Sequence, residues 1–306
     1  MTLKVGTRAS HLSRRQTESV LHALRQVDPA LRFDVVEVRT AGDRTTRSIP
    51  ELGGVGWFTR ELEAALLAGR VDLVVHSLKD LPTDPTPGLV VAAVPEREDP
   101  RDALVGPWPS LLDLPLGARV GTSSPRRAAQ LRAVRRDLDI VPLRGNVDTR
   151  LRKVAAGEVD AAVLALSGLL RGGWQDRVVL ALDPEQVLPA PGQGALAVQV
   201  RDGDRGVRDL AAALDHPASR AAVEAERAFL RALGGGCTLP AAALATCTDG
   251  TVRLRVRLLS EDGSRRVDAA QEGPQDLAEE VGRRAAEAVR GFLALVGGSR
   301  LSWPSP

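Results

Sequence analysis

The segment Gly121–Arg127, with the sequence GTSSPRR, has the features of an anion-binding site. Ser124 and Pro125 are residue types that begin helices. The N–H groups of a first helical turn have no partners within the helix and lie at the positive end of its dipole. Arg126 and Arg127 add two planar groups suited to carboxylate or phosphate. The pattern predicts an anion site, and the alternative is a solvated helix start with ordinary surface arginines.

A lysine and an aspartate, Lys79 and Asp80, follow the apolar run Val71–His76, which is typical of a strand buried on both faces. As a surface pair they would contribute little. As part of a cleft, the carboxylate would stabilise a cation, and the lysine would help to keep it ionised. Because the chain has only three lysines, we favour the second interpretation. We interpret His76 as structural.

Two further arginines, Arg8 and Arg144, come directly after predicted strands, and Arg150 lies in the helix that follows. In open α/β sheets, ligands bind at the carboxyl ends of the strands. We therefore expect these three arginines to converge with Arg126 and Arg127 on one cleft, which would suit a substrate with several carboxylates. Because nearly all basic residues of this chain are arginine, an arginine alone is weak evidence of function.

One of the two cysteines, Cys237, follows three glycines after the predicted helix Ala218–Leu233. Such a position is unlike that of a buried structural cysteine. The other, Cys247, lies in an alternating apolar segment and is interpreted as core. Two cysteines make neither a disulfide framework nor a four-ligand zinc site, and we expect no metal.

The elements that must position these residues occur twice in the chain. Lys4–Ser10 resembles Arg119–Ser124, and Gly69–Val75 resembles Gly157–Val163. A third pair of similar strands, Phe33–Arg39 and Leu138–Arg144, lies between them. The order of strands and helices is the same in both copies, which predicts two βαβ-type domains of similar architecture. Chance similarity among valine-rich strands is the alternative.

We expect three domains: residues 1–96 with 195–213, residues 100–189 as a repeat of the first, and residues 217–306. The first copy contains an additional glycine-rich segment, residues 40–57, which predicts a lid or binding loop. The third domain is expected to contain strands around Val252–Leu259 and a helix over Pro274–Val296, which indicates an α+β unit.

Composition excludes several classes of protein. The 306 residues are 43% hydrophobic and carry a formal net charge of +2, which does not suggest a general nucleic-acid binder. No apolar run is long enough to cross a membrane, and we find no signal-peptide pattern. We therefore expect a soluble cytoplasmic protein without nucleic-acid or membrane partners. We also expect a monomer, because no long apolar surface stripe remains.

Over essentially its whole length the chain resembles the porphobilinogen deaminase (hydroxymethylbilane synthase) family. The similarity includes Gln16 and the segments Thr7–Ser10, Gly53–Glu63, Val75–Asp80, Gly121–Arg127, Leu143–Leu151, Pro189–Ala195, Ala225–Phe229 and Gly235–Cys237. Each motif alone is weak, but their number and order make the similarity specific. The chain departs from the family in Glu51–Trp57, which lacks the lysines that family members often carry there.

The resemblance implies an α/β fold with two periplasmic-binding-protein-like βαβ domains around a cleft and a small α+β C-terminal domain. It implies a dipyrromethane cofactor attached covalently through Cys237. It also implies an enzyme that condenses four porphobilinogen molecules with release of ammonia, and then releases the linear tetrapyrrole hydroxymethylbilane by hydrolysis.

The resemblance further implies roles for single residues. Asp80 would be the catalytic carboxylate, and Phe58 would pack near a pyrrole ring. The acetate and propionate groups of cofactor and substrate would be bound by polar and basic side chains, which are Arg8, Ser10, Gln16, Lys79, Ser124, Arg126, Arg127, Arg144 and Arg150.

Two other classes remain as alternatives. A solute-binding or effector-binding protein would share the paired domains, but it would have no use for Cys237. A catalytically inactive relative would keep the fold, and the presence of both Asp80 and Cys237 argues against it.

Overall fold

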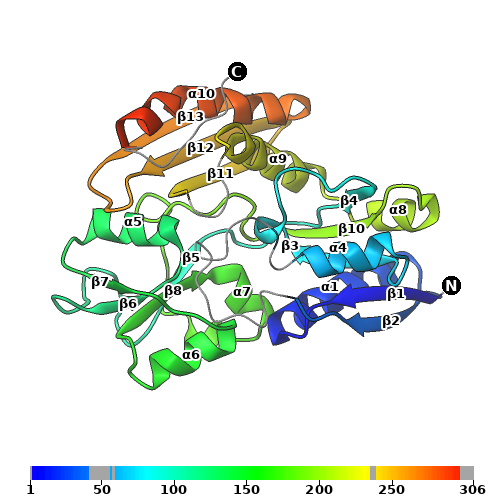
Figure 1. Ribbon diagram of the computed structural model, residues 1–306, viewed down its shortest axis with the longest axis horizontal. Coiled ribbons are helices and arrows are strands. Elements are labelled where there is room, and N and C mark those ends of the chain that lie inside the picture. Colours follow the sequence, from blue (N-terminus) through cyan, green and yellow to red (C-terminus); the bar gives the residue numbers. More distant parts are fainter. Residues whose placement is uncertain (1, 41–55, 57–58, 235–238, 297–306) are drawn as a thin grey trace.

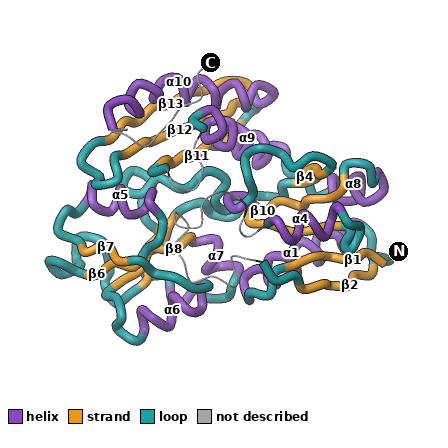
Figure 2. Tube along the Cα trace, viewed as in Figure 1, coloured by secondary structure: helices purple, strands orange, loops and turns teal. Residues whose placement is uncertain are grey.

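The computed structural model describes residues 2–40, 56, 59–234 and 239–296, and this part of the chain forms three β-sheets with flanking helices (Figure 1). The first two sheets lie beside each other (Figure 2). The third sheet, together with the two helices that cover it, lies against both. The predicted fold class, two α/β domains and a small α+β domain, is confirmed.

The first sheet has the strand order β2-β1-β3-β10-β4. Its strands are β1 (Thr2–Thr7), β2 (Arg32–Glu37), β3 (Leu73–Ser77), β4 (Leu89–Ala93) and β10 (Leu196–Arg201). Its helices are α1 (His11–Val27), α4 (Arg60–Leu67) and α8 (Arg205–Ala212). β1 pairs in parallel with β2 and β3, whereas β10 runs antiparallel between β3 and β4. The carboxyl ends of β1 and β3 therefore meet at one edge.

The second sheet repeats this topology, with the order β7-β6-β8-β5-β9. Its strands are β5 (Asp102–Val105), β6 (Arg119–Gly121), β7 (Asp139–Val141), β8 (Ala161–Ala165) and β9 (Leu180–Ala181). Its helices are α5 (Pro125–Val134), α6 (Val147–Ala155), α7 (Leu166–Arg171) and the 3₁₀ turn η2 (Gln175–Arg177). β6 pairs in parallel with β7 and β8, as β1 does with its neighbours, so the predicted repeat is confirmed.

The third domain is an antiparallel sheet β11-β12-β13 covered by two helices. Its elements are α9 (Pro217–Ala232), β11 (Ala241–Thr248), β12 (Thr251–Leu259), β13 (Arg266–Pro274), η3 (Gln275–Leu277) and α10 (Ala278–Val296). α9 and α10 pack closely, because a Cβ at Gly282 would lie 2.3 Å from the carbonyl oxygen of Ala225. Phe229 of α9 is fully buried in this core.

Some sequence predictions of local structure were wrong or incomplete. The spacing of Leu62, Leu66 and Leu67 in a helix predicts that all three lie in the core, but Leu67 is 51% exposed. Residues 96–117 are rich in Pro, Asp, Glu and Gly, which predicts a crossing between domains, yet they also contain β5, which is buried throughout. The predicted lid falls largely in 41–55 and 57–58, which lie outside the described residues. The domain boundaries themselves stay a prediction.

The domains touch at several points far apart in sequence. His11 of α1 lies 3.1 Å, through Nε2, from the carbonyl oxygen of Gly172, and its ring lies 5.1 Å from that of Trp174. Arg97, on the crossing segment, forms two hydrogen bonds of 2.7 and 3.0 Å with the fully buried Glu226 of α9. The first domain thus contacts the second, and the segment between these two domains contacts the third.

Candidate active site

Lys79 and Asp80 lie on a short 3₁₀ turn, η1 (Leu78–Asp80), directly after β3. Leu78 is buried and anchors the turn, and its N–H donates to the carbonyl oxygen of Ala195 at 3.0 Å. The Lys79 Nζ donates to Oε1 of Gln193 at 3.3 Å. Both charged side chains keep part of their surface exposed, at the edge of the sheet where ligands bind in such folds.

The pKa of Lys79 falls to about 8, first because of burial and then because Arg127 is close. The negative charges of Asp80 and Asp102 oppose this decrease. The ammonium of Lys79 therefore stays mostly protonated at neutral pH but loses its proton at a lower pH than an ordinary lysine, and an added anion would restore its basicity.

The predicted helix start at Ser124 is confirmed, because its hydroxyl accepts the Arg127 N–H at 3.4 Å and Pro125 opens α5. The two arginines, however, do not present free guanidinium groups as the anion-site prediction assumed. Arg126 donates to Oδ2 of Asp102 at 2.8 Å, and Arg127 donates to Oδ1 at 3.0 and 2.7 Å. One carboxylate, at the start of β5, thus partly neutralises both cations.

Asp102 is fully buried, and burial alone would raise its pKa. Arg126 and Arg127 outweigh burial and hold the pKa of Asp102 well below its usual range. A positive excess remains, because one carboxylate faces two guanidinium groups. The Arg126 Nε is buried without a hydrogen-bond partner among the described residues. Sequence analysis missed Asp102, because β5 is short and gives no periodic signal.

A single amide, that of Gln193, connects these groups. Its Nε2 donates to Oδ1 of Asp102 at 2.8 Å and to the carbonyl oxygen of Pro100 at 2.7 Å. Its Oε1 accepts from Lys79 and from Arg127, each at 3.3 Å. Gln193 is fully buried. It was noticed only as part of the Pro189–Ala195 motif and not as a site residue, because nothing local in the sequence shows its partners.

Arg144 and Arg150 belong to the second domain, near the edge strand β7 of its sheet. Arg144 follows β7, and Arg150 lies in α6, where its Nε donates to the carbonyl oxygen of Gly145 at 2.8 Å. The pKa of Arg150 falls to about 10 because of burial and the neighbouring charges of Arg127 and Arg144, whereas Asp80 raises it. Asp80 of the first domain and these arginines of the second therefore lie within electrostatic range of one another.

Arg8, Ser10 and Gln16 surround the end of β1. Arg8 lies close enough to His76 to lower the pKa of that imidazole. Ser10 caps α1 and accepts the N–H of Ser13 at 3.2 Å. The amide of Gln16 exchanges hydrogen bonds of 2.9 and 3.2 Å with the hydroxyl of Ser77, which precedes the η1 turn. Ligand binding by these three residues stays a prediction.

Sequence analysis also left out Arg171 of α7. Its Nη2 donates to the carbonyl oxygen of Gly194 at 2.7 Å, beside Gln193, and burial lowers its pKa. Two residues that the sequence analysis did name, Phe58 and Cys237, lie outside the described residues. In the sequence, α9 comes shortly before the segment that contains Cys237.

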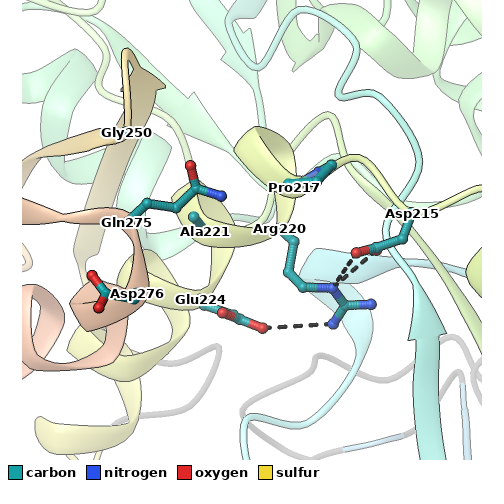
Figure 3. Close-up of a pocket in the computed structure, with 8 residues that line it drawn as sticks. All are labelled: Asp215, Pro217, Arg220, Ala221, Glu224, Gly250, Gln275 and Asp276. Atoms are coloured by element: carbon teal, nitrogen blue, oxygen red, sulfur yellow. Dashed lines mark hydrogen bonds and ion pairs between the residues drawn. The ribbon is translucent and has the colours of Figure 1, made fainter.

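A cavity of about 370 Å³ lies elsewhere, between α9, the β11–β12 turn and the start of η3 (Figure 3). Arg220 extends across it, 2.8 Å from Oδ2 of Asp215 and 3.5 Å from Oε1 of Glu224. None of the predicted site residues lines this cavity.

In the part of the chain that the structure describes, no helix is both long and apolar enough to span a membrane.

Comparison with protein families gives two matches along the chain. Residues 3–209 match the model described as "Porphobilinogen deaminase, dipyromethane cofactor binding domain". Residues 220–291 match "Porphobilinogen deaminase, C-terminal domain". The first match alone covers more than half of the sequence.

Curated relatives are similar over most of their length. A porphobilinogen deaminase of Syntrophobacter fumaroxidans is 46% identical over 92% of this chain and 92% of its own. That of Thermus thermophilus is 49% identical over 91% of this chain and 92% of its own. Among solved structures, the methionine binding protein MetQ aligns with 70% of this chain and 89% of its own at 15% identity, with a TM-score of 0.45.

Proposed function

Because the chain belongs to the porphobilinogen deaminase family, enzymes that condense porphobilinogen into hydroxymethylbilane in tetrapyrrole biosynthesis, we propose that Asp80 is its catalytic carboxylate. The proposed reaction joins four porphobilinogen units head to tail on a dipyrromethane primer held by Cys237. Each addition releases ammonia, and hydrolysis frees the linear product.

One observation carries this proposal. Asp80 lies next to Lys79 on the η1 turn and within electrostatic range of Arg150 from the second domain. Each porphobilinogen carries two carboxylates, so the growing chain accumulates negative charge that these cations would neutralise. A carboxylate placed among them is suited to stabilise a positive charge that forms only during the reaction.

The residues present fit a polycarboxylate cofactor. The pKa values of Lys79 and Arg150 fall to about 8 and about 10, first because of burial and then because neighbouring arginines are close, so an anion bound among them would be stabilised. The buried Arg126 Nε without a partner is a further unused donor. We propose that Lys79, Ser124 and the arginines of the second domain hold the carboxylates, and that the thiol of Cys237 forms the covalent attachment. When bound, a dipyrromethane supplies the nucleophilic pyrrole carbon that accepts the first new unit.

The residues of this chain would act on the incoming porphobilinogen as follows. Arg8, Arg144 and Arg150 bind its acetate and propionate groups, and so orient it. The bond between its methylene carbon and its protonated amino nitrogen breaks, and the electron pair leaves with that nitrogen as neutral ammonia. The carboxylate of Asp80 accepts a hydrogen bond from the pyrrole N–H and stabilises the cation that remains. A new carbon–carbon bond then forms, and a proton is lost from the attacked ring carbon.

Replacement of Asp80 by asparagine tests the proposal, because it removes the charge and keeps the shape. We expect kcat of Asp80→Asn to fall by about 10²- to 10³-fold, as when a charge-stabilising group is removed from an active site. Asp80→Glu should retain more activity, since it keeps the charge.

The matched control is Asp84→Asn, which removes an exposed carboxylate four residues further along the chain and should leave kcat unchanged. Ammonia release and tetrapyrrole formation are both measured. A value of kcat for Asp80→Asn within twofold of the wild type would rule out the proposed role.

A further inference from the structure

The helix α9 of the third domain contacts the turn that carries Asp80 through one side chain, Arg227. Its Nη1 donates to the carbonyl oxygen of Leu81 at 3.0 Å, and its Nη2 donates to that of Pro82 at 2.5 Å. A third, longer contact of 3.5 Å joins Nη1 to the carbonyl oxygen of Leu78. One guanidinium thus spans the backbone from the start of η1 to the two residues beyond it.

These contacts require an arginine. Burial and the neighbouring Arg231 lower the pKa of Arg227 to about 10, so the side chain stays charged at neutral pH. In the described part of the chain its hydrogen bonds go only to backbone carbonyls, although Asp84 and Glu224 lie within electrostatic range. A planar guanidinium reaches several carbonyls at once in a fixed geometry, which a lysine ammonium cannot do.

The preceding residue of α9, Glu226, holds a second turn of the site. Its Oε2 accepts the N–H of Gly192 at 2.6 Å, and Gly192 precedes the Gln193 that bridges Lys79 and Arg127. The two turns also lie against each other. A Cβ placed on Gly192, whose φ is +73°, would lie 3.3 Å from the backbone nitrogen of Lys79. Adjacent residues of one helix therefore support both turns.

We propose that Arg227 is a positioning residue, which fixes the backbone of residues 78–82 so that the Asp80 carboxylate keeps its place opposite the arginines of the second domain. This inference rests on the proposed role of Asp80. It makes α9 a common support of the η1 turn and of the turn at Gly192.

The test compares Arg227→Met and Arg227→Lys with the control Arg231→Met in the full-length enzyme. Arg231 lies one turn further along α9 and pairs with Glu279 on the surface, at 3.1 Å. The first readout is hydrogen exchange of the Leu78 and Leu81 amides, which are both hydrogen-bonded in the structure. Arg227→Met should speed this exchange by about tenfold or more, as expected for the loss of two or three hydrogen bonds to a charged group.

The second readout is the division of the effect between kcat and KM. Because Arg227 touches no substrate carboxylate in this account, Arg227→Met should lower kcat by about tenfold and change KM by less than about twofold. Arg227→Lys should recover part of kcat, and Arg231→Met should leave exchange and kcat unchanged.

Two results would overturn the inference. One is unchanged exchange at Leu78 and Leu81 in Arg227→Met. The other is faster exchange along the whole of α9 together with a lower kcat, a higher KM and a lower thermal stability. That combination would mean general destabilisation. If instead Asp80→Asn were fully active, the proposed function of Asp80 would fall, while the exchange data would still decide whether Arg227 fixes the turn.

Discussion

At the scale of single residues, the shared use of Asp102 by Arg126 and Arg127 determines how much positive charge the site offers. A buried carboxylate with two guanidinium partners avoids the cost of a buried unpaired charge. The pair of arginines keeps one net positive charge between them, and their geometry is fixed before any anion arrives. Preformed donors of this kind bind carboxylates without a large ordering cost.

The lowered pKa of Lys79 gives a prediction about pH. Because the pKa is about 8 rather than 10.5, Lys79 loses its charge as the pH rises through 8, and anion binding should weaken over that range. Because Lys79 is proposed to hold cofactor carboxylates, we expect loading of the cofactor-free protein with dipyrromethane to fall above pH 8 in the wild type and to fall less in Lys79→Arg, whose side chain stays charged.

The measurement is the fraction of cofactor-free protein that gains the dipyrromethane mass on incubation with porphobilinogen, across about two pH units on either side of that value, in the wild type, Lys79→Arg and Lys79→Met. Lys79→Met should load less cofactor at every pH and show no inflection near 8. Identical pH profiles in all three proteins would show that Lys79 does not contribute this charge.

Residues whose role depends on local context could be predicted, and residues whose role depends on distant partners could not. Ser124 was identified as a helix cap because its neighbours follow the capping pattern. Asp102 and Gln193 were missed because their partners lie far away in sequence and meet only when the two sheets are folded. The arginines were found, but their pairing with Asp102 was not.

At the scale of elements, a buried polar chain joins β3, β10 and α4 beneath the site. The imidazole of His76 lies 3.1 Å from Oε1 of Gln199, whose amide nitrogen donates to Glu63 at 3.0 Å. Thr86 donates to the same carboxylate at 2.9 Å. The interpretation of His76 as structural is thereby confirmed. Its pKa falls to about 4, chiefly because of burial, although the hydrogen bond with Gln199 opposes this decrease.

This shift predicts how stability depends on pH. Between pH 6.5 and about 4 the unfolded chain binds a proton at His76 that the folded chain does not. The contribution is therefore complete above pH 6.5 and is lost as the pH falls toward 4, with a total of about 3 kcal/mol.

Urea unfolding of the wild type and of His76→Gln at a series of pH values measures this contribution. The difference between their free energies of unfolding should change by about 3 kcal/mol over the range, while the carboxylates common to both proteins cancel. A constant difference would contradict the assigned pKa.

Long periodic elements were predicted well, and short strands were not. α9 begins and ends within one residue of the predicted helix Ala218–Leu233, because its apolar spacing and its start and end signals agree. β5 and β9 have too few residues to show a period, and their pairing is decided by the rest of the sheet. Leu67 follows the helical spacing of α4 but lies at its exposed end.

At the scale of the whole molecule, polar contacts between domains place the third domain relative to the other two. Arg257 of β12 donates at 3.1 Å both to Gln130 of α5 and to the carbonyl oxygen of Glu185. Gln130 in turn exchanges hydrogen bonds with the backbone of Leu188, to which Arg126 also donates. The third domain thus contacts the helix that begins with the predicted anion site, as well as the turn that carries Asp80.

This arrangement agrees with a cofactor that is attached in the third domain and bound by the first two. The overall architecture was predictable from the internal repeat, since two copies of one topology require two similar sheets. The way the third domain contacts both could not be read from the sequence, because residues such as Arg257, Glu226 and Arg227 show no local pattern that names their partners.

The intact mass of the denatured protein, compared with that of Cys237→Ser, tests the central claim most directly. We predict a mass excess of two condensed pyrrole units in the wild type, present after purification or after supply of porphobilinogen, and no excess in the variant. A wild-type mass equal to that of the bare sequence even after incubation with porphobilinogen, without release of ammonia, would contradict the covalent primer and the mechanism built on it.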